Sequence, residues 1–178
     1  MNALVCSQCH TKFPFDEKIW RCQCGAFLDI DFHAEFPIAK IEQRPPSLWR
    51  YREALPIVDD RAIITLDEGF TPLTSVPFDG REVLLKQDYL FPTGSFKDRG
   101  SSVLVSKLKE LGITRVVEDS SGNAGMSIAA YSARAGIACD IYVPEPTSPA
   151  RWRLQLAGEQ FHDGAHGDDH RDVDLIEV

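Results

Sequence analysis

Apolar and polar residues alternate in blocks from residue 83 to about residue 150, and the blocks have the lengths of strands and helices. The apolar run Val83-Leu84-Leu85 predicts a short buried strand, and apolar residues then recur at helical spacing from Val103 to Leu111. The full pattern predicts strands near 83–87, 114–118 and 138–143, helices at 96–111 and 123–136, and a helix start near 148. Strands that alternate with helices of this length predict an α/β fold, in which helices flank a parallel sheet.

The segment 34–65 has a different pattern and is interpreted as a linker. It contains one short amphipathic sequence between Pro46 and Pro56, which predicts a single short helix with Ser47 as its cap. We expect Trp49 and Tyr51 to pack on the main domain, and partner binding is the alternative for these two aromatic residues.

Composition limits the classes of protein to consider. The chain has 178 residues, of which 43% are hydrophobic and 26% charged, as is typical of a globular protein. A formal net charge of −8 without a basic stretch argues against nucleic-acid binding. No apolar run reaches membrane-spanning length and no secretory signal pattern is present, so we expect a cytoplasmic protein without a membrane partner.

Four of the five cysteines form two close pairs near the N-terminus. Cys6 and Cys9 make the first pair, and Cys22 and Cys24 the second. Two pairs of thiols at this interval are typical of a structural zinc site, so residues 1–33 are predicted to form a zinc ribbon. Disulfides are the competing interpretation, and His10 is an alternative ligand. Cys139 stands apart and is interpreted as a small buried hydrophobic residue.

Lys97 lies where the first predicted strand gives way to a helix. A turn at 92–94 ends the strand, Ser95 is the expected N-cap and Gly112 the expected helix end, which places Lys97 in the first helical turn. The positive end of the helix dipole favours a neutral amine, which can attack a carbonyl and form a Schiff base. The free N–H groups there could also bind an anion. The alternative is an ordinary surface lysine.

A second strand–loop–helix unit follows at 115–136, with the loop Ser120-Ser121-Gly122-Asn123 at its centre. Short side chains and a glycine let backbone N–H groups surround an anion, although the same residues also suit an ordinary turn. Lys97 and Asn123 both follow predicted strands of one parallel sheet. Because ligands collect at the carboxyl ends of such strands, we expect the two residues at the same edge of the sheet.

Three segments, at 67–73, 92–100 and 119–125, together resemble motifs of threonine synthases, within the fold-type II family of pyridoxal phosphate enzymes. The N-terminal cysteine module is also similar to that family. The resemblance implies that Lys97 binds the cofactor and is catalytic, and that Asn123 hydrogen-bonds the cofactor ring hydroxyl. It implies substrate binding by Ser120, Ser121, Gly122 and Thr71, with the loop holding the substrate carboxylate.

The resemblance also implies a reaction, in which O-phosphohomoserine and water give threonine and phosphate. The partner is then a small amino-acid substrate, and homo-oligomerisation stays open. A serine/threonine dehydratase or a cysteate synthase is the alternative within the same family. Residues 66–150 are interpreted as the N-terminal part of the pyridoxal phosphate domain.

The last segment, 151–178, departs from this pattern. It has three arginines and seven acidic residues, and its composition predicts a disordered acidic tail. A metal site of His162, His166 and His170 is the alternative, although the intervening glycines argue against a helix there. The glycine-rich phosphate loop usual in fold-type II enzymes is not found in the sequence. We therefore expect a truncated chain whose catalytic competence is open, with a non-catalytic, zinc-stabilised binding module as the alternative.

Overall fold

The computed structural model describes residues 2–143 and 176–177. A three-stranded parallel sheet carries the C-terminal half, with strand order β7-β6-β8. It is formed by β6 (Arg115–Asp119), β7 (Ala138–Tyr142) and the short β8 (Ile176–Glu177). Helix α3 (Asn123–Ala135) connects β6 to β7 and ends at Gly136, whose φ of 73° is left-handed. The predicted elements at 114–118, 123–136 and 138–143 are thereby confirmed.

Strand β8 comes from the segment predicted to be a tail, and it pairs with Val116 and Val117 of β6. The rest of that segment, the predicted helix start near 148 and the three-histidine alternative lie outside the described residues.

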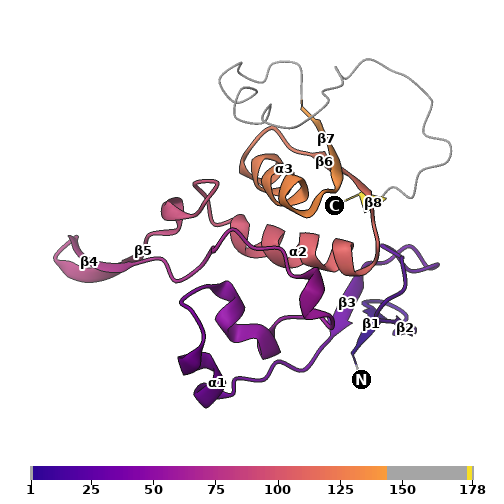
Figure 1. Ribbon diagram of the computed structural model, residues 1–178, viewed down its shortest axis with the longest axis horizontal. Helices are drawn as coiled ribbons and strands as arrows, with labels where there is room; N and C mark the ends of the chain where they lie inside the picture. The colour runs from indigo at the N-terminus through magenta and orange to yellow at the C-terminus, as the bar shows by residue number, and fades with distance from the viewer. Residues whose placement is uncertain (1, 144–175, 178) are drawn as a thin grey trace.

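Helix α2 (Asp98–Glu110) packs on α3, as Figure 1 shows. The prediction that this helix begins at 96 is wrong by two residues. Lys97 is the N-cap position, immediately before the helix, and its own side chain makes no cap bond. Ser95 lies in the preceding turn, where its hydroxyl accepts a long, 3.4 Å bond from the Lys97 N–H. Gly112 follows the helix with a φ of 70°, as expected for a helix end.

The hydrophobic core lies between α2, α3 and the sheet. Its central buried members are Ile64, Val105, Leu108, Ile113, Val116, Ile128, Ala129, Tyr131, Ile137, Cys139 and Ile141. The predicted burial of Cys139 is confirmed. No helix among the described residues is both long and apolar enough to cross a lipid bilayer.

The apolar run at 83–86 was predicted to be a buried strand of the parallel sheet, and that prediction is wrong. It forms β5 (Arg81–Lys86), which pairs antiparallel with β4 (Leu73–Phe78) in a separate two-stranded sheet. Every residue of β5 is exposed, and Leu84 exposes 62% of its surface. In Figure 1 this hairpin projects from the end of the molecule near the start of α2. A short apolar run predicts a strand, but it does not say which strand will pair with it.

The linker contains more structure than the one predicted helix. Helix α1 (Ile38–Gln43) precedes η1 (Leu48–Ala54), and η2 (Asp60–Ala62) follows. At the predicted helix, η1 is a 3₁₀ segment kinked at Tyr51, and Ser47 makes no side-chain cap bond. Trp49 is buried against the main domain as expected, whereas Tyr51 is partly exposed.

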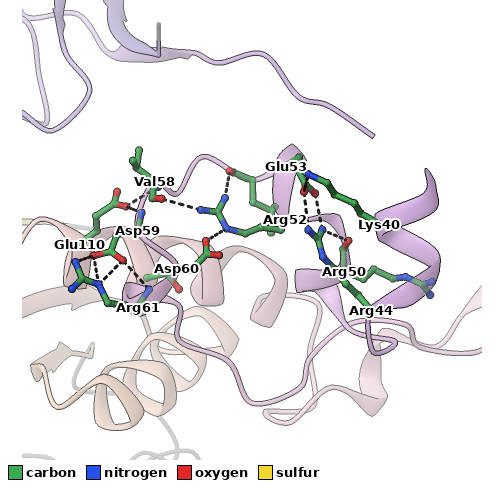
Figure 2. Close-up of polar contacts among 12 residues, drawn as sticks. Lys40, Arg44, Arg50, Arg52, Glu53, Val58, Asp59, Asp60, Arg61 and Glu110 are labelled. Atoms are coloured by element: carbon green, nitrogen blue, oxygen red, sulfur yellow. Dashed lines mark hydrogen bonds and ion pairs between the residues drawn. The ribbon is translucent and has the colours of Figure 1, made fainter. Parts of the chain in front are cut away.

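Ion pairs hold the linker to itself and hydrogen bonds hold it to α2, as Figure 2 shows. Glu53 pairs with Arg44 and Lys40, and Arg52 with Asp60. Glu110, at the end of α2, accepts the backbone N–H groups of Val58 and Asp59 at 2.7 and 2.6 Å. The linker is therefore anchored on the C-terminal end of α2.

The N-terminal module is a three-stranded antiparallel sheet in the order β2-β1-β3, formed by β1 (Ala3–Cys6), β2 (Lys12–Pro14) and β3 (Leu28–Asp31). The Lys107 ammonium of α2 lies 3.8 Å from the centre of the Phe15 ring. This contact joins the module to the end of α2 opposite to Lys97 (Figure 1).

Candidate functional site

The turn that carries Lys97 is tied to α3 by Asp98, the first residue of α2. Asp98 is fully buried. Its carboxylate accepts the Thr93 N–H at 2.9 Å, the Thr93 hydroxyl, and the Ser127 hydroxyl at 2.6 Å. Ser127 stands four residues after Asn123, one turn into α3. The Asp98–Ser127 bond therefore brings the beginnings of α2 and α3 side by side.

Lys97 itself is exposed, with its ammonium 5.2 Å from the centre of the neighbouring Phe96 ring. Its charge also reaches the end of β6. Burial raises the pKa of the Glu118 carboxyl, Asp119 raises it further, and Lys97 opposes both. The charge of Lys97 thus acts on the end of β6, the strand that leads into the Ser120-to-Asn123 loop.

The loop from Ser120 to Asn123 leaves the N-terminus of α3 open. The Ser120 N–H donates to the Tyr142 carbonyl at 3.1 Å, and the Gly122 N–H donates to the Ser120 hydroxyl at 3.3 Å. Gly122 is the N-cap residue and has no side chain to bond the first N–H groups of α3, no acidic residue lies in the first turn of that helix, and Asn123 is exposed. A side chain at Gly122 would begin in open space, with no heavy atom within 4 Å of its Cβ. Helix N–H groups without a side-chain cap suit an anionic group.

Thr71 has a different setting from the loop. It is buried, and its hydroxyl donates to Asp88 at 2.6 Å. Asp88 also accepts the Arg99 guanidinium at 2.9 and 3.1 Å, and this pairing holds the pKa of Asp88 below its usual range. The Thr71 hydroxyl is thus bonded into a network that ends on α2, two residues after Lys97.

Glu68 is the structurally important residue that the sequence reasoning did not single out. It is 1% exposed and lies beneath the helix pair. Its carboxylate accepts bonds from five groups: the Trp49 indole at 2.9 Å, the Thr65 hydroxyl at 3.1 Å, the Leu66 N–H at 2.8 Å, the Tyr131 hydroxyl at 2.9 Å and the Ser102 hydroxyl. Burial, with the charge of Glu68, raises the pKa of Tyr131 far above its usual value. The only sign of Glu68 in the sequence is that it is an acidic residue inside the 67–73 motif.

The four cysteines predicted to bind metal come together in the N-terminal module. The sulfurs of Cys6, Cys9, Cys22 and Cys24 all lie within 4.8 Å of one another. The closest sulfur pairs are 3.4 and 3.5 Å apart, well beyond the length of a disulfide bond, and all four cysteines are free. His10 is not part of this cluster, which is the one group of potential metal ligands among the described residues.

The surroundings of these sulfurs suit a bound cation. The backbone N–H groups of Cys9 and Gln8 donate to the Cys6 sulfur at 3.3 and 3.4 Å, and the bond from Cys9 contributes most to lowering the pKa of Cys6. Hydrogen bonding from Thr11 lowers the pKa of Cys9 to about 6. The Cys24 N–H favours the Cys22 thiolate, but burial and the neighbouring thiols together raise the pKa of Cys22 to about 12. Four sulfur donors at this separation fit the tetrahedral coordination of zinc.

Comparison with known proteins places the chain among enzymes of one kind. Residues 64–176 match the family described as pyridoxal-phosphate dependent enzyme. The threonine synthase of Methanocaldococcus jannaschii is 39% identical over 150 residues, which cover 79% of this chain and 37% of that protein. The threonine synthase of Methanosarcina acetivorans is 35% identical over 153 residues, which cover 81% of this chain and 37% of that protein. The chain thus spans 37% of the length of each of these relatives.

Among solved structures, the chain is similar to a pyridoxal 5'-phosphate-dependent aspartate racemase. That likeness has a TM-score of 0.47 and 33% sequence identity, and it covers 52% of this chain and 32% of the racemase chain.

Proposed function

Because the chain belongs to the family of pyridoxal-phosphate dependent enzymes, we propose that Lys97 is its cofactor-binding lysine and that its reaction is that of a threonine synthase. The proposed reaction eliminates phosphate from O-phosphohomoserine and adds water to give threonine. Its support is the identity with two threonine synthases, at 39% and 35%. Both are longer proteins, so the proposal extends from them to this chain.

The residues around the start of α2 and α3 fit the cofactor. Pyridoxal phosphate, when bound, supplies an electron sink next to the substrate amine. Lys97 would hold the cofactor through its exposed amine and would then transfer protons as a general acid and base. Asn123 would orient the ring through its exposed amide. The backbone around Ser120, Ser121 and Gly122 would hold the substrate carboxylate, and Thr71 would border the substrate.

One observation carries this assignment, namely the bond from Ser127 to the buried Asp98 at 2.6 Å. It joins the residue after Lys97 to Ser127, one turn into the helix that begins with Asn123. The two segments that carry the exposed side chains of Lys97 and Asn123 are thereby joined by a buried hydrogen bond. An ordinary surface lysine, whose only role is to be in contact with water, would need no such buried support.

We also propose that Cys6, Cys9, Cys22 and Cys24 bind one structural zinc. All four coordination positions would be filled by sulfur, which leaves none for a substrate. The metal would therefore stabilise the N-terminal module without taking part in the reaction.

The test is to locate the lysine that binds the cofactor. Pyridoxal phosphate is added to the purified chain, the imine is reduced with borohydride, and the labelled peptide is identified by mass spectrometry. We expect the label mainly on Lys97, and we expect Lys97→Ala to abolish the imine absorption band. Lys109→Ala is the matched control, because Lys109 is an exposed lysine near the other end of the same helix.

The result that would contradict the proposal is a label spread evenly over the lysines of the unaltered chain. If Lys97 is labelled, phosphate release from O-phosphohomoserine then tests the reaction. Release of ammonia from serine or threonine would instead support a dehydratase. A labelled Lys97 with no turnover of either substrate would support the non-catalytic alternative.

A further inference from the structure

We propose that Asp98 is a positioning residue for Lys97, and that its carboxylate fixes the turn carrying the lysine against the start of α3. This inference rests on the proposed function, because it assigns Asp98 a role toward the lysine that would bind the cofactor. Asp98 is an unusual neighbour for such a lysine, since it is adjacent in sequence and yet 0% exposed.

The hydrogen bonds of Asp98 close the turn on itself. Its Oδ2 accepts the Thr93 N–H at 2.9 Å, and its Oδ1 accepts the Thr93 hydroxyl. The Asp98 side chain therefore bonds back to Thr93, and it holds together the two ends of the turn that contains Lys97. Oδ1 also accepts the Ser127 hydroxyl at 2.6 Å, so the closed turn is bonded to α3. All three donors are neutral, and the positive end of α2 compensates the buried charge.

A second layer of bonds lies one helical turn deeper. Ser102 of α2 and Tyr131 of α3 both donate to Glu68. Residues four apart share a helix face, so Asp98 and Ser102 line one helix while Ser127 and Tyr131 line the other. Hydrogen bonds depend strongly on direction, and two such layers hold the helices in one relative position. Because the Glu68 layer does not involve Asp98, the helix pair should survive when Asp98 is changed.

The roles of the two carboxylate oxygens explain why an amide of the same shape should not replace the Asp98 carboxylate in this turn. Asparagine could keep one oxygen for the hydroxyls of Thr93 and Ser127. Its NH₂ group would then face the Thr93 N–H, and two donors cannot bond to each other. Asp98→Asn should therefore loosen the turn around Lys97 while it leaves the core intact.

The experiment compares cofactor labelling of two lysines in the same helix. Pyridoxal phosphate and borohydride are applied to the 178-residue chain, and the ratio of label on Lys97 to label on Lys109 is measured. Asp98→Asn should lower this ratio about tenfold, the change that follows from losing one hydrogen bond to a charged group. Ser127→Ala should lower it by a smaller factor, because the bonds from Thr93 remain.

Ser132→Ala is the matched control. Ser132 is also fully buried on α3, but its hydroxyl has no hydrogen-bond partner among the described residues. This variant removes the same atom without touching Asp98, so it should keep the labelling ratio of the unaltered chain. A purely structural effect of losing a buried hydroxyl would lower the ratio in both serine variants alike.

Amide hydrogen exchange supplies a readout without the cofactor. The Thr93 amide should exchange about tenfold faster in Asp98→Asn, because its acceptor is lost. Unchanged labelling in both Asp98→Asn and Ser127→Ala would overturn the inference and leave the proposed function standing. If Asp98→Asn does not fold, the inference is decided by comparing the labelling ratios of Ser127→Ala and Ser132→Ala. If the unaltered chain shows no preference for Lys97, the proposed function fails, and the Thr93 exchange rate alone decides whether Asp98 fixes the turn.

Discussion

Gly69 shows how a single residue of the 67–73 motif is determined by backbone geometry. The Leu48 N–H donates to the Glu68 carbonyl at 2.7 Å, which brings the linker backbone directly onto the motif. Gly69 has a φ of +106°, and a Cβ there would lie 2.4 Å from the Leu48 nitrogen. Only glycine has both the conformation and the space. The Glu-Gly pair therefore fixes the linker on one side while the Glu68 side chain fixes the two helices on the other.

Gly69→Ala should accordingly destabilise the protein. We expect a loss of about 3 kcal/mol in the free energy of unfolding, from the combined cost of the left-handed conformation and the clash. Gly80→Ala is the control, since Gly80 has a φ of +70° but no atom within 4 Å of the added Cβ. It should lose only about 1 kcal/mol, the conformational part. Urea unfolding of both variants measures the difference, and equal losses would show that the contact with Leu48 is unimportant.

At the scale of elements, α1 and η1 are joined by a carboxylate with two cationic partners. Arg44 binds Glu53 through two bonds of 2.6 and 2.7 Å, and Lys40 lies 3.4 Å away (Figure 2). The bond with Arg44 contributes most to lowering the pKa of Glu53 from 4.5 to about 2. A lowered carboxyl pKa means that the folded state favours the charged form. The stabilisation is then complete above about pH 4.5 and is lost as the pH falls toward 2.

This pairing predicts a specific change in titration. In Arg44→Met the pKa of Glu53 should rise from about 2 toward 4.5, because its strongest partner is gone. The part of the acid destabilisation that Glu53 contributes should shrink with it. Carboxyl-detected NMR titration measures the pKa directly. Arg61→Met is the control, since Arg61 pairs with Asp59 and should leave Glu53 unchanged. A Glu53 pKa that stays near 2 in Arg44→Met would show that Lys40 or the backbone is the main cause.

The elements differ in how well the sequence predicted them. The unit β6-α3-β7 was predicted because its strands and helix are local, and Gly136 marks the helix end. The two cysteine pairs were also predicted correctly as a cluster, since close spacing brings each pair together. Strand β5 was assigned to the wrong sheet, because Val83, Leu84 and Leu85 show only that a strand is apolar.

The support of the site was the part that could not be predicted. Asp98 and Glu68 look like ordinary acidic residues in the sequence, and their partners lie 29 and up to 63 positions away. Bonds of that range depend on how the helices pack, and packing leaves no periodic signal in the residues themselves. Lys97 and Asn123 were proposed from the sequence because each stands in a loop before a predicted helix, although the strand that precedes Lys97 belongs to the separate hairpin and not to the parallel sheet. Their buried support became visible only with the helix pair in place.

At the scale of the whole molecule, the N-terminal module stands largely apart from the hydrophobic core. Among the described residues, none from β1, β2 or β3 belongs to that core. The module contacts α2 through the Phe15 ring and the Lys107 ammonium. Of the residues in its three short strands, Cys6 alone is buried. Small sheets of this kind rarely bury enough apolar surface to fold alone, so the proposed zinc would supply the stability.

Metal removal should therefore unfold the module alone. With zinc bound, the purified chain should contain one metal ion, and a chelator should speed amide exchange in β1 and β3 while α2 and α3 stay protected. The core of α2, α3 and the parallel sheet does not depend on the module for its packing. Cys22→Ser should behave like the chelated protein, because it removes a buried ligand, whereas Cys139→Ser should retain the metal. If α2 and α3 lost protection together with the module, the contact through Lys107 and the linker would couple the two parts. Zinc would then stabilise the lysine site from the opposite end of α2.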